Sequence, residues 1–180
     1  MRAITTAILT TLLFAANVPA QGPIYSPDQP SSQTEQKEPA AILEVGAAGE
    51  WALTHGRPSY GPNLAVEFTP IPKWLEIEAG VTPFFSRGQT EWDTDLIFKK
   101  PFTLSRTVEF MAGVGPEWAH TAANGIAANT FAAEAAADFM FWPSPRRRFG
   151  WYLEPSYAYS FSSDHDQSLS VTAGLLIAIP

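Results

Sequence analysis

Acidic residues recur at one fixed place in the alternating segments of this sequence. Between Trp74 and Phe85, Glu76 and Glu78 alternate with Leu75 and Ile77. Carboxylates that share a confined space bind hard cations or join a hydrogen-bonded network with hydroxyls and water. We name this set the acidic ladder; it consists of Glu44, Glu67, Glu76, Glu78, Glu91, Glu109, Glu134, Asp138 and Glu154.

Two interpretations of the ladder differ in what balances its charge. We favour a hydrated acid network in a side-chain-filled interior, closed by Tyr152, Ser156 and Thr172 and by Arg87 or Arg106. The alternative is a narrow interior that binds or conducts cations.

The other candidates for chemistry are histidines and one serine-rich segment. His55, His120 and His165 could hold a metal if their predicted loops converged, but separate polar loops favour solvated histidines, so we expect no metal and no cofactor. The run 162–165, Ser-Ser-Asp-His, supplies hydrolase residue types, yet adjacent residues cannot form a nucleophile–base–orienter relay. We therefore predict no catalytic residue and keep a lipid-modifying enzyme as a second alternative.

Bulk composition limits the class of protein that can carry these residues. The 180-residue chain has 16% charged and 13% aromatic residues, a net charge of −7 and no cysteine. The acidic balance argues against nucleic-acid binding, and the missing cysteine excludes disulfides and thiol chemistry. A mean hydropathy near zero suits a barrel whose strands are half polar.

Three segments follow along the chain. Residues 1–20 read as a cleaved signal peptide, with Arg2, an apolar run and small residues before the end of the segment. Residues 21–39 are rich in Pro, Gln and Ser, which predicts a disordered periplasmic lead. Residues 40–180 alternate almost throughout and predict one all-β domain.

The alternation predicts about eight antiparallel strands, close to the length that a tilted membrane strand needs. An even number of antiparallel strands can close into an up-and-down transmembrane β-barrel with short periplasmic turns. Strand period outweighs helix propensity in the alanine-rich segment 130–141. The predicted strands are 41–53, 63–69, 74–85, 89–98, 107–118, 130–141, 150–161 and 168–179.

Tryptophans favour lipid over a dry core as the surroundings of the apolar face. All six fall beside predicted loops or turns, as in the aromatic girdle of a membrane barrel. The predicted girdle is Trp51, Trp74, Trp92, Trp118, Trp142 and Trp151. The bases Lys73, Lys99, Lys100 and 146–148 are all predicted in turns at the end that holds both termini, which we expect to face the periplasm.

The last strand carries the most specific signal. Thr172, Gly174, Ile177 and Ile179 fit the pattern polar, x, Gly, x, x, hydrophobic, x, aromatic, with aliphatic Ile179 in the aromatic slot and Pro180 after it. With this signal the chain resembles the small eight-stranded outer-membrane β-barrel proteins of Gram-negative bacteria. The resemblance implies a monomer in the cell outer membrane, contact with lipids and lipopolysaccharide, insertion by the barrel-assembly machinery, and a structural or adhesive role.

Overall fold

The computed structural model describes residues 39–53, 58–123, 126–144 and 146–180. The predicted signal peptide and the lead up to residue 38 lie outside these ranges, as does His55. Within the described ranges, no helix is long and apolar enough to cross a bilayer.

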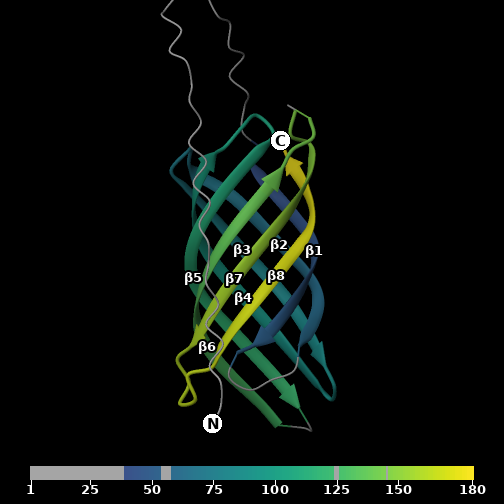
Figure 1. Cartoon of the computed structure of the whole chain (residues 1–180), viewed down its shortest axis with the longest axis vertical. Coiled ribbons are helices and arrows are strands. Elements are labelled where there is room, and N and C mark those ends of the chain that lie inside the picture. The colour runs from purple at the N-terminus through teal and green to yellow at the C-terminus, as the bar shows by residue number, and fades with distance from the viewer. Residues whose placement is uncertain (1–38, 54–57, 124–125, 145) are drawn as a thin grey trace, which may run out of the picture. The chain divides into compact units, whose positions relative to one another are not determined.

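The described chain forms a closed antiparallel barrel in which each strand pairs with the next (Figure 1). Closure joins β8 to β1, from Ala41 opposite Ile179 to Ala52 opposite Ser168. The predicted all-β, eight-stranded fold is therefore confirmed. The strands are β1 Ala41–Ala52, β2 Ser59–Ile71, β3 Leu75–Ser86, β4 Gln89–Thr103, β5 Val108–Ala123, β6 Ile126–Phe141, β7 Phe149–Ser160 and β8 Gln167–Ile179.

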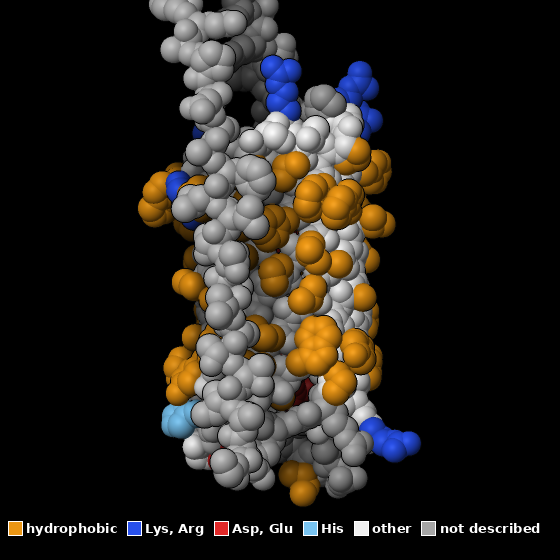
Figure 2. Space-filling model, viewed as in Figure 1, with side chains coloured by type: hydrophobic (Ala, Val, Ile, Leu, Met, Phe, Trp, Pro, Cys, Tyr) orange, Lys and Arg blue, Asp and Glu red, His pale blue; other side chains and the backbone are white. Residues whose placement is uncertain are grey.

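The apolar face of the strands is the outer face. Val114 is 64% exposed and Leu153 is also exposed, whereas Glu76 and Glu154 are buried within the barrel. Hydrophobic side chains are spread along the barrel wall, and Lys and Arg gather near its ends (Figure 2). This orientation is the one that a lipid environment requires, because a water-soluble barrel would bury its apolar face.

Alternation also decides the conformation of the alanine-rich strand β6. Phe131 is 63% exposed while Ala132, Ala136 and Asp138 are buried, so successive side chains point to opposite faces. The strand is hydrogen-bonded on both sides, to β5 and β7. Backbone pairing in the closed sheet outweighs the helix propensity of alanine here.

Several strands extend further than the sequence predicted. The segment 99–101, predicted as a turn, lies in β4, and Pro101 pairs with Met111 near the strand end. The predicted loop around His120 is a continuation of the β5–β6 hairpin, paired as far as Ala123 and Ile126. β2 begins at Ser59, inside another predicted loop. Proline and small residues near the strand ends do not end these strands, because the neighbouring strands of the closed sheet continue to pair with them there.

The place of Trp142 in the predicted girdle is wrong. Its side chain is 1% exposed and packs inside the barrel with Met111, Met140 and Tyr152. The preceding Phe141 points outward, where its ring stacks on Trp151 with centroids 3.9 Å apart, so alternation sends Trp142 inward. The other five girdle tryptophans, Trp51, Trp74, Trp92, Trp118 and Trp151, are exposed on the outer face.

This difference predicts which tryptophans lipid can reach. Two single-tryptophan variants retain Trp142 or Trp151, which lie beside the same turn. In vesicles whose acyl chains are brominated, we expect strong quenching of Trp151 fluorescence and little quenching of Trp142, because bromine quenches on contact. Equal quenching of both would contradict the inward position of Trp142.

Candidate functional site: an acidic barrel interior

A buried lysine ties together acids from three strands across the barrel interior. The Lys99 ammonium, on β4, forms ion pairs with Glu78 on β3 and Glu154 on β7, and its Nζ lies 3.5 Å from an oxygen of Asp138 on β6. The Lys99 side chain is 0% exposed. A buried charge survives only with such partners, because desolvation of an unpaired ion costs several kcal/mol.

Lys99 was predicted in a turn, and this prediction is wrong. Its neighbour Gly113 on β5 explains how the strand accommodates it, because a Cβ at Gly113 would lie 2.7 Å from Lys99 Cγ. Gly80 makes the same kind of room for Asp95, whose carboxylate oxygen would be 2.7 Å from an added Cβ. Glycines on the inner face thus leave space for long polar side chains in a narrow barrel.

The structure places all nine ladder residues in the barrel, but at different levels and with different partners. Glu44 and Glu67 are fully buried beside the Lys99 group, and both oxygens of Glu67 and one of Glu44 lack a hydrogen-bond donor among the described residues. Glu109 pairs with Arg147 at 2.6 Å near the end that holds the C-terminus. Glu91, at the opposite end, accepts a hydrogen bond from Thr121.

Glu76 and Glu134 complete the ladder, Glu76 at the C-terminal end and Glu134 deeper in the barrel. Glu76 is buried and lines a cavity of about 670 Å³ at the C-terminal end, together with Lys73 and the arginines 146–148. Glu134 borders a small void of about 30 Å³ farther from the C-terminal end, which is also lined by Glu50, Asp93 and Glu117.

Part of the interior is apolar, which the pattern of acids on the inner face does not predict. Ile42, Met111, Met140, Trp142 and Leu176 pack together with Tyr152 as a cluster of buried side chains. We name this cluster the apolar plug. It fills the barrel with side chains, as expected for eight strands.

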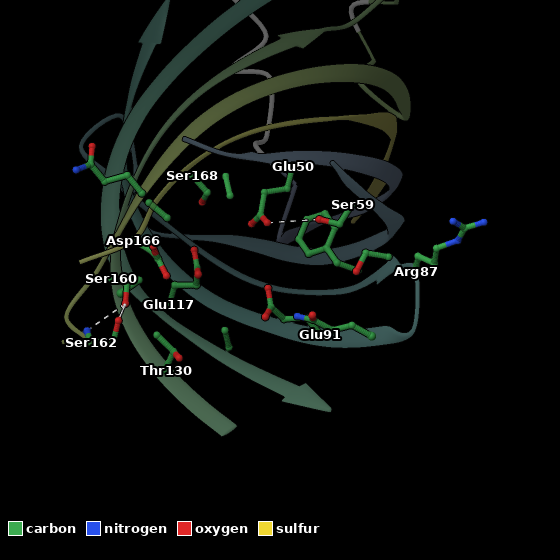
Figure 3. A pocket seen from close by; sticks show the side chains of 18 residues that line it. Glu50, Ser59, Arg87, Glu91, Glu117, Thr130, Ser160, Ser162, Asp166 and Ser168 are labelled. Carbon is green, nitrogen blue, oxygen red and sulfur yellow. Dashed lines mark hydrogen bonds between the residues drawn. The ribbon is translucent and has the colours of Figure 1, made fainter. Parts of the chain in front are cut away.

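A second acidic group lies at the end where the strands are joined by the 86–89 and 161–166 connections, which we call the loop end. A cavity of about 450 Å³ opens there, and Glu50, Glu91 and Glu117 point into it (Figure 3). Buried Asp93 lies deeper in the barrel than this cavity, beside the small void. Glu50, Asp93, Asp95 and Glu117 were not among the predicted site residues, although their places in the alternation are the same as those of the ladder acids.

The predicted closure of the network is partly different. The hydroxyl of Tyr152 donates to Asn63 at 2.8 Å, and Ser156 pairs with Ser170 at 2.7 Å. Arg87 and Arg106 do not close it: both are exposed, and Arg87 extends away from the cavity (Figure 3). Two other described bases pair with ladder acids: Lys99, whose position in β4 points inward, and Arg147, which pairs with Glu109 near the C-terminal end.

The two described histidines contact different partners, and neither contacts a serine side chain. His120 lies in β5, where its Nδ1 is 2.9 Å from Asn129 Oδ1, and His165 Nδ1 is 3.1 Å from the Tyr159 hydroxyl. The His165 imidazole therefore meets a tyrosine rather than a serine hydroxyl. Ser163 lies 3.4 Å from Asp164. This arrangement is not the relay that serine hydrolysis requires.

The last-strand signal lies at the closing seam of the barrel. In β8, Thr172 and Gly174 occupy the inner-face positions of the alternation, while Ile177 and Ile179 occupy the outer-face positions. Ile179 pairs with Ala41 of β1.

Comparisons with known proteins agree on the fold. No protein-family model and no curated protein sequence matches this chain. Neisserial surface protein A aligns with a TM-score of 0.61 and 10% identity over 77% of this chain and 96% of its own. The N-terminal β-barrel domain of Pseudomonas aeruginosa OprF aligns with a TM-score of 0.55 and 11% identity, over 78% of this chain and 100% of its own.

The attachment invasion locus protein Ail of Yersinia pestis is a third neighbour, with a TM-score of 0.52 and 15% identity over 78% of this chain and 99% of its own. At these identities the likeness establishes the fold alone. The chain has the fold of the small eight-stranded outer-membrane β-barrels.

Replacing Lys99 tests the buried ion-pair group. Lys99→Met leaves carboxylates without their cation, and we expect a loss of about 3 kcal/mol or more in the free energy of unfolding. Lys100→Met is the matched control: Lys100 donates to the Lys73 carbonyl at 2.9 Å and lies over Trp74, contacts worth less than about 1 kcal/mol. Urea unfolding of the refolded barrel in micelles measures both, and equal losses would contradict a special role of Lys99.

Proposed function

We propose that this protein is an integral outer-membrane β-barrel of structural or adhesive type, with an acidic, side-chain-filled interior. The observation that carries the proposal is the direction of the strand faces: exposed aliphatics and five tryptophans outside, carboxylates and Lys99 inside. Only a hydrocarbon surrounding makes that outer face favourable. The fold shared with small outer-membrane barrels supports the same location.

The adhesive side of the proposal rests on the β5–β6 hairpin. Both strands have 16 residues, whereas about 9 to 11 suffice to cross a membrane. The hairpin therefore projects beyond the bilayer at the loop end, and Ile126 near its tip is exposed. Ail, a neighbour in fold, is named for attachment and invasion. A projecting hairpin is a surface on which a partner can bind.

The proposal includes the lipid and assembly partners expected from the sequence. The outer wall contacts membrane lipids and lipopolysaccharide, the barrel is a monomer, and Thr172, Gly174, Ile177 and Ile179 serve as the signal for the barrel-assembly machinery. The end with residue 39, the C-terminus and the arginines 146–148 faces the periplasm, which leaves the loop end outside.

Fractionation of cells that express the full chain tests the location. We expect the protein in the outer-membrane fraction, with faster migration on a gel before boiling than after it, because a closed barrel resists detergent unfolding. A soluble periplasmic protein without this heat-modifiable migration would contradict the proposal.

A cation-conducting barrel is the second candidate, favoured by the number of interior acids. The apolar plug and the Lys99 group oppose conduction, since side chains fill the barrel between its two end cavities. In planar bilayers we expect no steady cation-selective current from the wild-type protein. A stable current that is insensitive to Lys99→Met would instead favour the conducting function.

A further inference from the structure

The barrel interior holds two acidic groups that differ in one respect. With the loop end taken as the top, which is the reverse of Figure 1, the lower group, around Glu44, Glu78 and Asp138, contains the Lys99 ammonium. In the upper group, Glu50, Glu91 and Asp93 form no ion pair with any Lys or Arg that the structure describes. Like charges at such short range repel strongly away from bulk water, so the upper group must either take up protons or bind a cation from solution.

The geometry of the upper group matches that of an oxygen-ligated ion. Glu50 comes from β1, and Glu91 and Asp93 come from β4, three strands away around the barrel. One carboxylate oxygen from each lies within 4.8 Å of the others. Two oxygens that each lie about 2.4 Å from one Ca²⁺ ion can be at most that far apart.

Asp93 provides an independent observation that points to a ligand. Asp93 is only 6% exposed, and its Oδ1 has no hydrogen-bond partner among the described residues. Buried carboxylate oxygens are rarely left without a donor or a metal. By contrast, Glu91 accepts from Thr121, and Glu50 accepts from Ser59 at 3.4 Å.

An ion can reach this place from solution. The upper cavity is open at the loop end, and its wall carries hydroxyls as well as acids, among them Ser59, Ser168 and Thr130 (Figure 3). The void on the inner side of this cavity, about 30 Å³, is large enough for a water molecule or a single ion. Glu117 borders both spaces and can add a further oxygen.

We propose that Glu50, Glu91 and Asp93 bind one divalent cation of the Ca²⁺ type at the loop end of the barrel, where no described Lys or Arg forms an ion pair with them. Oxygen ligands only, a spacing of up to 4.8 Å between them and room for water favour Ca²⁺ over Mg²⁺, which demands a tighter octahedron. The ion links β1 to β4 across the interior, as Lys99 links β4 to β7 nearer the C-terminal end.

Equilibrium dialysis with ⁴⁵Ca²⁺ tests the proposal on the full chain, refolded in a neutral detergent without lipopolysaccharide, whose phosphates bind divalent cations themselves. We expect one saturable site with a dissociation constant of about 10⁻⁴ to 10⁻³ M, the range of extracellular calcium modules. Asp93→Asn and Glu50→Gln each weaken binding at least tenfold. Glu76→Gln, the same chemical change at the opposite end, leaves it unchanged.

Thermal unfolding provides the second measurement. Calcium raises the midpoint of the wild-type protein and of Glu76→Gln, but not that of Asp93→Asn, at constant ionic strength. The proposal is overturned if the folded wild-type barrel binds no calcium, if Asp93→Asn and Glu50→Gln bind as well as wild type, or if Mg²⁺ binds more tightly. Heat-modifiable migration of each sample shows that the barrel has formed, so a negative result here bears on the cation site and leaves the membrane location untouched.

Discussion

The ion-pair group of Lys99 is the interaction on which the interior of this barrel depends. A closed eight-stranded sheet has a narrow centre, and every second residue must share it. In this chain many of those residues are acids, and one ammonium contacts Glu78, Asp138 and Glu154 from three different strands. The arrangement compensates charge locally and fixes the spacing of walls that are not neighbours in the sheet.

The rest of the interior is organised around this point. Toward the C-terminal end the apolar plug fills the barrel with Trp142, Tyr152 and the methionines, and Arg147 neutralises Glu109 beyond it. Toward the loop end the side chains become smaller and more hydroxylic, and the interior widens into a cavity. The two halves therefore balance their acids differently: one contains built-in bases, and the other opens to solution, from which protons or cations can enter.

Residue alternation was sufficient to predict the barrel, the number of strands and the outward direction of aliphatics such as Val114 and Leu153. The predictions are wrong where a nearby proline or a place at a strand end was weighed above the alternation. Lys99 was assigned to a turn because Pro101 follows, and Trp142 was assigned to the girdle because it lies at a strand end. Counting parity from Phe98 and Phe141, which both point outward, places both residues inside.

Which acids share a partner could not be read from the sequence. Glu78, Asp138 and Glu154 are far apart along the chain, and their convergence on one ammonium depends on the stagger between strands, which alternation does not determine. The room made by Gly113 and Gly80 belongs to the same class of information, because it depends on which residue lies opposite on the next strand.

The Lys99 group also constrains the route by which the chain enters a bilayer. β4 meets β6 and β7 only across the interior, so its ammonium finds Asp138 and Glu154 only when the sheet has curled. A β3–β4 hairpin inserted alone would pair Lys99 only with Glu78, and β6 and β7 would carry Asp138 and Glu154 into hydrocarbon without their base, at a cost of several kcal/mol each. Insertion as a nearly closed cylinder, with late strands already facing early ones, avoids that barrier.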